Sequence, residues 1–279
     1  MFKTLLLSGG AMQGFYTLGY LQKAYEQNIL TNIDVYIGVS SGAIICYLFL
    51  IGYTPVEIIL FVVKYAGLNS TFEKFKDFDF IKMMKGEGAI SFDETVGKIL
   101  HKMSMDKIGY IPTFIDIKEK QNKKLILSVY NLTKMTNEYM SYENYPNLTC
   151  LEAIAMSCSV PFFFKEIIYN SNRYIDGGIS DNLPIKIAEK EGLKTLAISI
   201  NPDSMTQPCF IYENPIKYFC CLCLIPVLQI TKNKVHDSVN ITFIKINPDP
   251  SDISFSMDSN IKILDMFSIG YKQCDVTLY

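Results

Sequence analysis

Residues 35–42, which read Val-Tyr-Ile-Gly-Val-Ser-Ser-Gly, decide the fold of this chain. A short run of β-branched and aromatic residues leads directly into Gly-x-Ser-x-Gly around Ser40. This order is typical of a nucleophile elbow, a tight strand-to-helix turn that projects a serine clear of a sheet. Because the two arms of such a turn approach closely, Gly38 and Gly42 are expected to have no room for a Cβ. The stretch therefore predicts an α/β fold with Ser40 as a candidate nucleophile.

The sequence on either side of Ser40 supports this interpretation. Residues 35–39 have the composition of a buried strand, and residues 43–50 are apolar on every face, as in a helix packed beneath a sheet. A glycine-rich strand-to-helix turn without chemistry is the alternative interpretation, because five residues with three fixed letters recur by chance.

Composition limits the class of protein. The chain has 279 residues, of which 49% are hydrophobic and 19% charged, so it can bury a large core. We find no internal repeat and no long linker, and we predict one domain over residues 1–279 built on a mostly parallel sheet. The net charge of -2 gives no basis for nucleic-acid binding, and the lysines of residues 118–124 are interpreted as a solvated hairpin turn between two strands.

Cysteine and histidine usage gives no sign of a metal or a cofactor. Eight cysteines are too sparse for a disulfide scaffold, which favours a reducing compartment. His101 and His236 lie far apart, and the cysteines of residues 220–223 lack a second ligand pair. Residues 1–8 hold only about five apolar residues, short of the apolar region of a secretory signal. We expect a cytoplasmic location and no secretion.

Strand and helix patterns alternate along the chain. Residues 113–117 and 124–130 are interpreted as a hairpin or neighbouring strands, and residues 68–90 as irregular. The remaining strands are predicted over residues 2–7, 166–169, 173–175, 195–200 and 240–246, and the remaining helices over residues 13–27, 56–65, 92–103, 149–157, 184–191 and 259–273.

Two further glycine-bearing segments carry candidate chemistry. Residues 8–14, Ser-Gly-Gly-Ala-Met-Gln-Gly, lie between the first strand and the first helix and fit neither a Walker A loop nor Gly-x-Gly-x-x-Gly. We interpret them as an oxyanion hole, in which backbone N–H groups stabilise a negative oxygen. Residues 174–178, Tyr-Ile-Asp-Gly-Gly, end a strand with the Asp176 carboxylate, followed by Gly177 and Gly178. Alone, Asp176 would be a turn aspartate; beside an elbow, it is a candidate base.

Three ordered blocks resemble the patatin-like phospholipases. They cover residues 7–14, which end at Gly14, residues 37–43 and residues 152–184, and the similarity extends over residues 3–201. The resemblance implies a three-layer α/β/α fold and a metal-free dyad, with Ser40 as nucleophile and Asp176 as base, that acts on lipid acyl esters.

The chain departs from the family pattern in the first block. Ala11 stands where the third glycine is usual, and Gln13 stands where the family has Lys or Arg. Ala11 can still offer a backbone N–H if its φ is negative, whereas Gln13 supplies no charge. Loss of one oxyanion donor costs about 100- to 1000-fold in rate, so we expect a slowed enzyme.

The expected reaction is serine acyl hydrolysis of phospholipids or related lipid esters. Asp176 accepts the Ser40 proton, and N–H groups hold the oxyanion until water cleaves the acyl-enzyme. The donors expected for this role belong to Gly9, Gly10, Ala11 and Ser41. One alternative is an α/β-hydrolase with a Ser40, Asp176 and His236 triad, although only two strands precede Ser40. The other is a lipid-binding module without catalysis, suggested by the changes in the first block.

Residues 218–230 are apolar for about a dozen positions, fewer than the roughly 20 needed to span a bilayer. They belong to a C-terminal extension over residues 205–279. Two interpretations remain open: a buried helix broken at Pro226, or a lid or interfacial segment that contacts lipid. The cysteines within it are candidate palmitoylation sites. We expect peripheral membrane contact and a phospholipid or other acyl ester as the partner.

Overall fold

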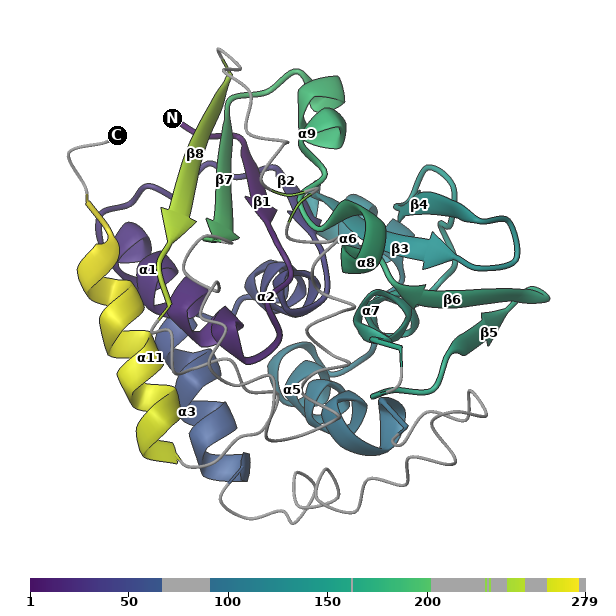
Figure 1. The fold of residues 1–279 in the computed structure, drawn as a ribbon, viewed down its shortest axis with the longest axis horizontal. Helices are drawn as coiled ribbons and strands as arrows, with labels where there is room; N and C mark the ends of the chain where they lie inside the picture. Colours follow the sequence, from purple (N-terminus) through teal and green to yellow (C-terminus); the bar gives the residue numbers. More distant parts are fainter. Residues whose placement is uncertain are drawn as a thin grey trace.

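A mixed eight-stranded sheet forms the centre of the molecule (Figure 1). The computed structural model describes residues 1–66, 91–161, 163–201, 229, 231, 240–248 and 260–275. Its strands are β1 (Thr4–Leu7), β2 (Val35–Gly38), β3 (Lys124–Asn131), β4 (Thr136–Met140), β5 (Ile167–Tyr169), β6 (Asn172–Asp176), β7 (Thr195–Ile200) and β8 (Ile241–Ile246). The order is β5-β6-β3-β2-β1-β7-β8, and β4 pairs with β3. Strands β3, β2, β1, β7 and β8, which are neighbours in the sheet, run parallel to one another. Strands β4, β5 and β6 make antiparallel pairs.

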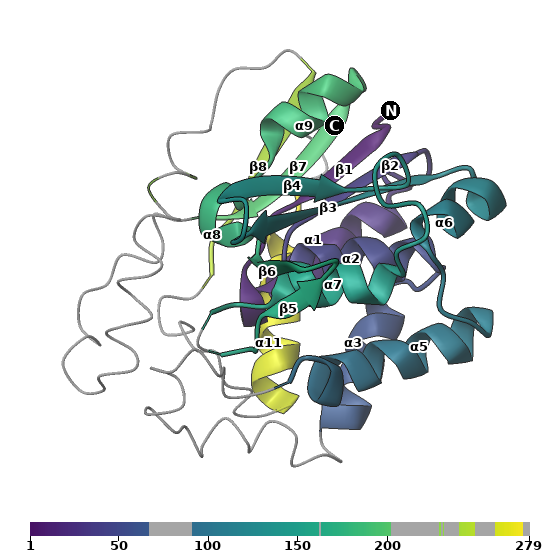
Figure 2. The same cartoon turned by 90° about the vertical axis from the view of Figure 1, so that its right-hand side faces the viewer.

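Helices cover both faces of the sheet. They are α1 (Gly14–Glu26), α2 (Ser41–Leu50), α3 (Pro55–Ala66), α5 (Lys98–Ile108), α6 (Phe114–Gln121), α7 (Cys150–Cys158), α8 (Gly178–Asp181), α9 (Ile185–Glu191) and α11 (Asn260–Gln273), with short turns of other helix types at η1 (Ala11–Gln13) and η3 (Asp93–Gly97). Helix α9 lies on one side of the sheet, and α1, α2, α3, α5 and α11 lie on the other (Figure 2). The expected three-layer α/β/α architecture is therefore present.

Alternation along the strands explains the two layers of core. Successive side chains of a strand point to opposite faces, so Leu5 and Leu7 enter the large core beneath the sheet while Leu6 enters the smaller core under α9. All three side chains are fully buried. A strand that is buried on both faces has a continuous run of apolar residues, so strands of this kind can be recognised in the sequence.

Two glycines let α1 and α11 touch backbone to backbone beneath the sheet. A Cβ on Gly19 would lie 1.9 Å from the carbonyl oxygen of Phe267, and one on Gly270 would lie 1.9 Å from that of Tyr16. Both views place the two helices next to each other. Helix α11 thus packs directly against α1, the helix that follows the glycine-bearing segment of residues 8–14.

One predicted hairpin is wrong. Residues 113–117 were expected to form a strand, but they open helix α6. The lysine-rich segment of residues 118–124, expected to be a turn between two strands, continues this helix to Gln121, and β3 begins at Lys124. The reason is a capping box: the Thr113 side chain accepts from the N–H of Asp116, whose carboxylate accepts from the N–H of Thr113. The actual antiparallel partner of β3 within this part of the chain is β4, which the sequence pattern did not indicate.

Most other elements lie within a few residues of their predicted bounds. The helical prediction over residues 92–103 covers η3 and most of α5, which continues to Ile108. The predictions for residues 68–90 and for residues 218–230, together with those for His236 and the cysteines of residues 220–223, lie outside the described residues. Among the described residues no single helix has the length and apolarity to cross a bilayer; only α2 and α3 together, bent by 117° between them, meet those criteria.

Candidate active site

Ser40 occupies the sharp turn between β2 and α2. Its φ of 52° and ψ of -123° lie in a region that residues with a side chain rarely adopt. A Cβ on Gly38 would stand 2.5 Å from the Cα of Ala43, and one on Gly42 would stand 2.5 Å from the carbonyl oxygen of Leu7. The turn therefore has no space for larger residues at these two positions, and the Ser40 side chain projects from it.

A buried serine ties this turn to the sheet. The N–H of Ser40 donates to the Oγ of Ser157 at 3.0 Å, and that Oγ donates to the carbonyl oxygen of Ser128 on β3 at 2.8 Å. Ser157 on α7 is completely buried. Sequence reasoning missed it, although a serine within the apolar run of α7 is a signal that a buried backbone group needs a partner.

Ser40 and Asp176 meet because two strands share one edge of β3. Gly38, at the end of β2, pairs with Leu127, and Asp176, at the end of β6, pairs with Val129. Strand β4 occupies the opposite edge along this stretch. Since β2 runs parallel to β3 and β6 runs antiparallel, their C-terminal ends point toward each other. Ser40 and Asp176, 136 positions apart in the chain, thus reach one site.

The Asp176 carboxyl is buried, with 3% of its surface exposed. Burial raises its pKa to about 6, and hydrogen bonding by the Ser40 side chain and by the N–H of Gly178, at 2.6 Å from Oδ1, offsets part of that rise. A Cβ on Gly177 would stand 2.4 Å from the carbonyl oxygen of Ser128, so this loop also needs its glycine. The carboxylate can act as a base near neutral pH.

The glycine-bearing segment after β1 is held by side chains. The N–H of Gly9 donates to Oδ1 of Asn182 at 3.0 Å, and Nδ2 of Asn182 donates back to the carbonyl oxygen of Gly9 at 3.2 Å. The N–H of Gly10 donates to the Oγ of Ser41 at 3.1 Å. These two N–H groups, expected to face an oxyanion, therefore already have side-chain acceptors, and Asn182 was not anticipated from the sequence.

Ala11 and Gln13 adopt positions that differ from expectation. Ala11 has a φ of 48°, a left-handed conformation that a glycine would adopt without strain. The negative φ on which its role as a donor was expected to depend is therefore not present. No described residue accepts its N–H. Gln13 is buried, and its Oε1 has no hydrogen-bond partner among the described residues.

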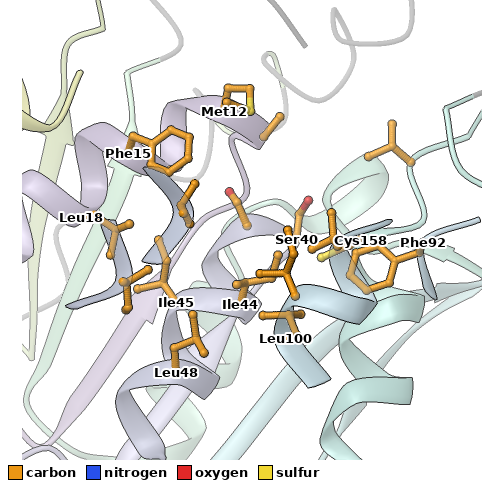
Figure 3. Close-up of a pocket in the computed structure, with 18 of the residues that line it drawn as sticks. Met12, Phe15, Leu18, Ser40, Ile44, Ile45, Leu48, Phe92, Leu100 and Cys158 are labelled. Atoms are coloured by element: carbon orange, nitrogen blue, oxygen red, sulfur yellow. The ribbon is translucent and has the colours of Figure 1, made fainter. Parts of the chain in front are cut away.

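An apolar cavity of about 210 Å³ opens beside Ser40. It is lined by α1, α2, α3 and α5, and the hydroxyls of Ser40 and Ser41 and the thiol of Cys158 are its polar side-chain groups. Ile44, Ile45 and Leu48 follow one another along α2 away from Ser40 (Figure 3). Burial raises the pKa of the Cys158 thiol well above its usual value, so the thiol stays protonated beside Ser40.

Neither histidine takes part in the described site. His101 is exposed on α5 and does not line the cavity, while His236 lies outside the described residues. Among the residues that the structure describes, no cluster of three His, Cys, Asp or Glu side chains could hold a metal ion.

A family model and several curated proteins match this chain. A family model described as patatin-like phospholipase matches residues 5–189. The protein described as "Probable lipid hydrolase 463L" of Invertebrate iridescent virus 6 is 32% identical over 284 residues, which cover 99% of this chain and 88% of that protein. The uncharacterised protein R571 of Acanthamoeba polyphaga mimivirus is 28% identical and covers 97% of this chain.

Solved structures share the fold at low sequence identity. VipD from Legionella pneumophila superimposes with a TM-score of 0.55 at 15% identity, over 99% of this chain and 66% of that one. ExoU in its complex with SpcU from Pseudomonas aeruginosa gives a TM-score of 0.51 at 14% identity, over 98% of this chain and 50% of that one. Both likenesses concern the fold alone.

Proposed function

Since this chain belongs to the patatin-like phospholipase family, we propose that it hydrolyses lipid acyl esters with Ser40 as nucleophile and Asp176 as general base. One observation carries the proposal. A buried carboxylate whose pKa is raised to about 6 lies within hydrogen-bonding range of a strained serine at an apolar cavity. A carboxylate is a weak base for a hydroxyl, and burial is what strengthens it here.

The first half of the reaction acylates Ser40. Asp176 accepts the hydroxyl proton as the Ser40 Oγ forms a bond to the ester carbonyl carbon, and the π electrons of the carbonyl move onto its oxygen. The oxyanion then re-forms the carbonyl, and the bond to the alcohol oxygen breaks. Asp176 returns its proton to that leaving oxygen.

The second half regenerates the enzyme. Asp176 takes a proton from water, whose oxygen attacks the acyl carbon, and the bond to Ser40 Oγ breaks. Ser40 recovers the proton, and a fatty acid leaves. No step requires a metal or a cofactor.

The N–H groups of Ala11 and Ser41 are the backbone donors best suited to the oxyanion. Both residues line the cavity with Ser40, and no described residue accepts either N–H. Ser41 begins α2, so its N–H also lies at the positive end of that helix. The N–H groups of Gly9 and Gly10 are already bonded to the side chains of Asn182 and Ser41, so they do not contact the oxyanion directly.

The substrate class follows from the cavity. Its lining beyond the Ser40 end is hydrocarbon, which suits an acyl chain better than a polar leaving group. We infer that the substrate is a phospholipid or a related lipid ester, and that the enzyme cleaves its carboxylic ester bond as a phospholipase A does. The protein would reach this substrate by peripheral contact with a membrane surface. A cytoplasmic location is part of the same proposal.

Fatty-acid release from mixed phospholipid vesicles, with chelator present, tests this function. Wild type should release fatty acid, while Ser40→Ala and Asp176→Asn should lose at least about 1000-fold in kcat. His236→Asn should match wild type. Equal loss in His236→Asn would favour the α/β-hydrolase triad, and an inactive but folded wild type would favour a lipid-binding module.

A further inference from the structure

The hydroxyl of Ser41 lies at the cavity beside Ser40, and it has no role in the proposed reaction as described above. Its Oγ accepts the N–H of Gly10 at 3.1 Å, and the residue lines the cavity together with Ser40. A hydroxyl that accepts one hydrogen bond keeps its own hydrogen for another partner. None of the described residues accepts that hydrogen.

The surroundings hold this side chain in place. Ser41 is the first residue of α2, and a Cβ on Gly14 would come within 3.2 Å of its Cβ and 3.3 Å of its Oγ. The side chain is thus confined between the turn of Gly10 and the start of α1. Because its acceptor side is taken by Gly10, its donor side is what it can offer to the cavity.

We propose that the Ser41 hydroxyl is an oxyanion donor and that it relays the N–H of Gly10. This inference rests on the proposed function. As the carbonyl π electrons move onto oxygen, Ser41 donates its hydroxyl hydrogen bond to that oxygen, and no proton is transferred. The N–H of Gly10 polarises the hydroxyl in the same direction, since hydrogen bonds in a chain strengthen one another. The Ser41 backbone N–H and side chain then supply two donors from one residue.

The relay adds stabilisation at a site that receives no charge from Gln13. Gln13 stands where a cation is usual, and it brings no charge to the site. A polarised hydroxyl at Ser41 adds stabilisation where negative charge develops, in a largely apolar cavity where a hydrogen bond is stronger than in water.

Ser41→Ala is the decisive variant. Alanine preserves the helix start and the backbone N–H, so only the hydroxyl is lost. We expect kcat on vesicle phospholipid to fall about 100-fold with KM nearly unchanged, because the interaction forms only in the transition state. Ser41→Thr keeps the hydroxyl and should retain most of the activity that alanine loses.

A matched control separates this effect from the loss of any hydroxyl. Ser91 also accepts a backbone N–H, that of Glu94 at 3.4 Å, but it does not line the cavity. Ser91→Ala should therefore leave kcat unchanged. Each alanine variant loses one acceptor of a backbone N–H, so both should stay folded and melt cooperatively, with similar small falls in melting temperature.

Two results would overturn the relay. Ser41→Ala with unchanged or raised kcat would mean that the hydroxyl is idle, or that it blocks the N–H of Gly10 in the free enzyme. A fall in kcat for both Ser41→Ala and Ser41→Thr, with a melting temperature well below that of Ser91→Ala, would mean a structural role only. An inactive wild type would instead overturn the proposed function, and this inference with it.

Discussion

Gly9 and Asn182 hold each other through two hydrogen bonds, one in each direction between the backbone of Gly9 and the amide of Asn182. Oδ1 of Asn182 would also lie 2.9 Å from a Cβ on Gly178, so this amide bridges the loop after β1 and the loop that follows Asp176. Asn182 therefore holds the loop that continues from Gly9 to Ala11, one of the proposed oxyanion donors, next to the loop of the base.

Replacing Asn182 with alanine should slow the reaction. Both hydrogen bonds are lost and Gly9 keeps unpaired backbone groups, a cost of about 1–3 kcal/mol for a buried polar group. We expect kcat to fall about 10- to 100-fold in vesicle assays while the protein still melts cooperatively. Asn182→Asp should fall as well, because a carboxylate cannot donate to the carbonyl of Gly9. Activity equal to wild type in both variants would remove Asn182 from the account.

The raised pKa of Asp176 predicts an acid limb in the rate profile. Asp176 must be ionised to accept a proton, and its pKa in the free protein is raised to about 6. The value of kcat/KM should therefore fall about tenfold for each pH unit below 6 and level off above 7. A short-chain soluble ester measures this without changes in vesicle charge. A rate that stays constant down to pH 4.5 would exclude Asp176 as the base.

The same burial predicts that Asp176→Asn stabilises the fold. The folded pKa of about 6 exceeds the ordinary 3.8, so folded protein binds more protons than unfolded protein between these values, and stability falls as pH rises through this window. At pH 7 the charge costs about 3 kcal/mol, which the uncharged amide avoids. Chemical unfolding should show a more stable variant at pH 7 and no gain near pH 3. Equal or lower stability at pH 7 would contradict a desolvated carboxylate.

Filling the cavity should shorten the acyl chains that the enzyme accepts. Val62 on α3 lines the cavity and is only partly buried, so Val62→Phe adds volume there without displacing a fully buried side chain. We expect kcat/KM for long-chain esters to fall more than tenfold relative to short-chain esters. Leu60→Phe on the same helix is the control, because Leu60 is 58% exposed and lies outside the cavity. An equal fall for all chain lengths would place the acyl chain elsewhere.

Contact between α1 and α11 should make Gly270 intolerant of any side chain. A Cβ there would overlap the carbonyl oxygen of Tyr16, so Gly270→Ala must push the helices apart. We expect a loss of about 1–3 kcal/mol in the free energy of unfolding, as for other overpacked sites. Lys272→Ala, near the end of the same helix, should change stability little. Unfolding by denaturant measures both, and equal stabilities would mean that the helices do not touch.

Local signals were sufficient to predict most of the fold. The predicted strand of residues 195–200 has the same bounds as β7, because six consecutive apolar or small residues suit a strand buried on both faces. The end of α9 at Glu191 was likewise predicted, and the next residue is Gly192, whose φ of 67° is typical of a glycine that ends a helix. The failure at residues 113–117 came from β-branched composition, which the capping box of Thr113 and Asp116 overrides.

Pairings between distant residues were not predictable from single segments. Glycine spacing makes the turn around Ser40 recognisable, but nothing in that stretch points to Ser157, whose hydrogen bond to Ser40 spans 117 residues of the chain. Likewise, nothing around Gly9 points to Asn182, which bonds it from 173 residues away. The shared edge of β3 depends on sheet order, which the pattern of strands did not fix. The hydrogen bond from the N–H of Gly10 to the Oγ of Ser41 could be found only in the structure. In the sequence, both residues were expected to contribute only backbone N–H groups to the oxyanion hole.

Covalent trapping of the nucleophile tests the central claim most directly. A fluorophosphonate carrying a long alkyl chain should add one phosphonyl group to wild type, and peptide mass mapping should place it on Ser40. Ser40→Ala should gain no mass, and Asp176→Asn should react at least about 100-fold more slowly. Equal labelling of Ser40→Ala, or a modified residue other than Ser40, would contradict the account.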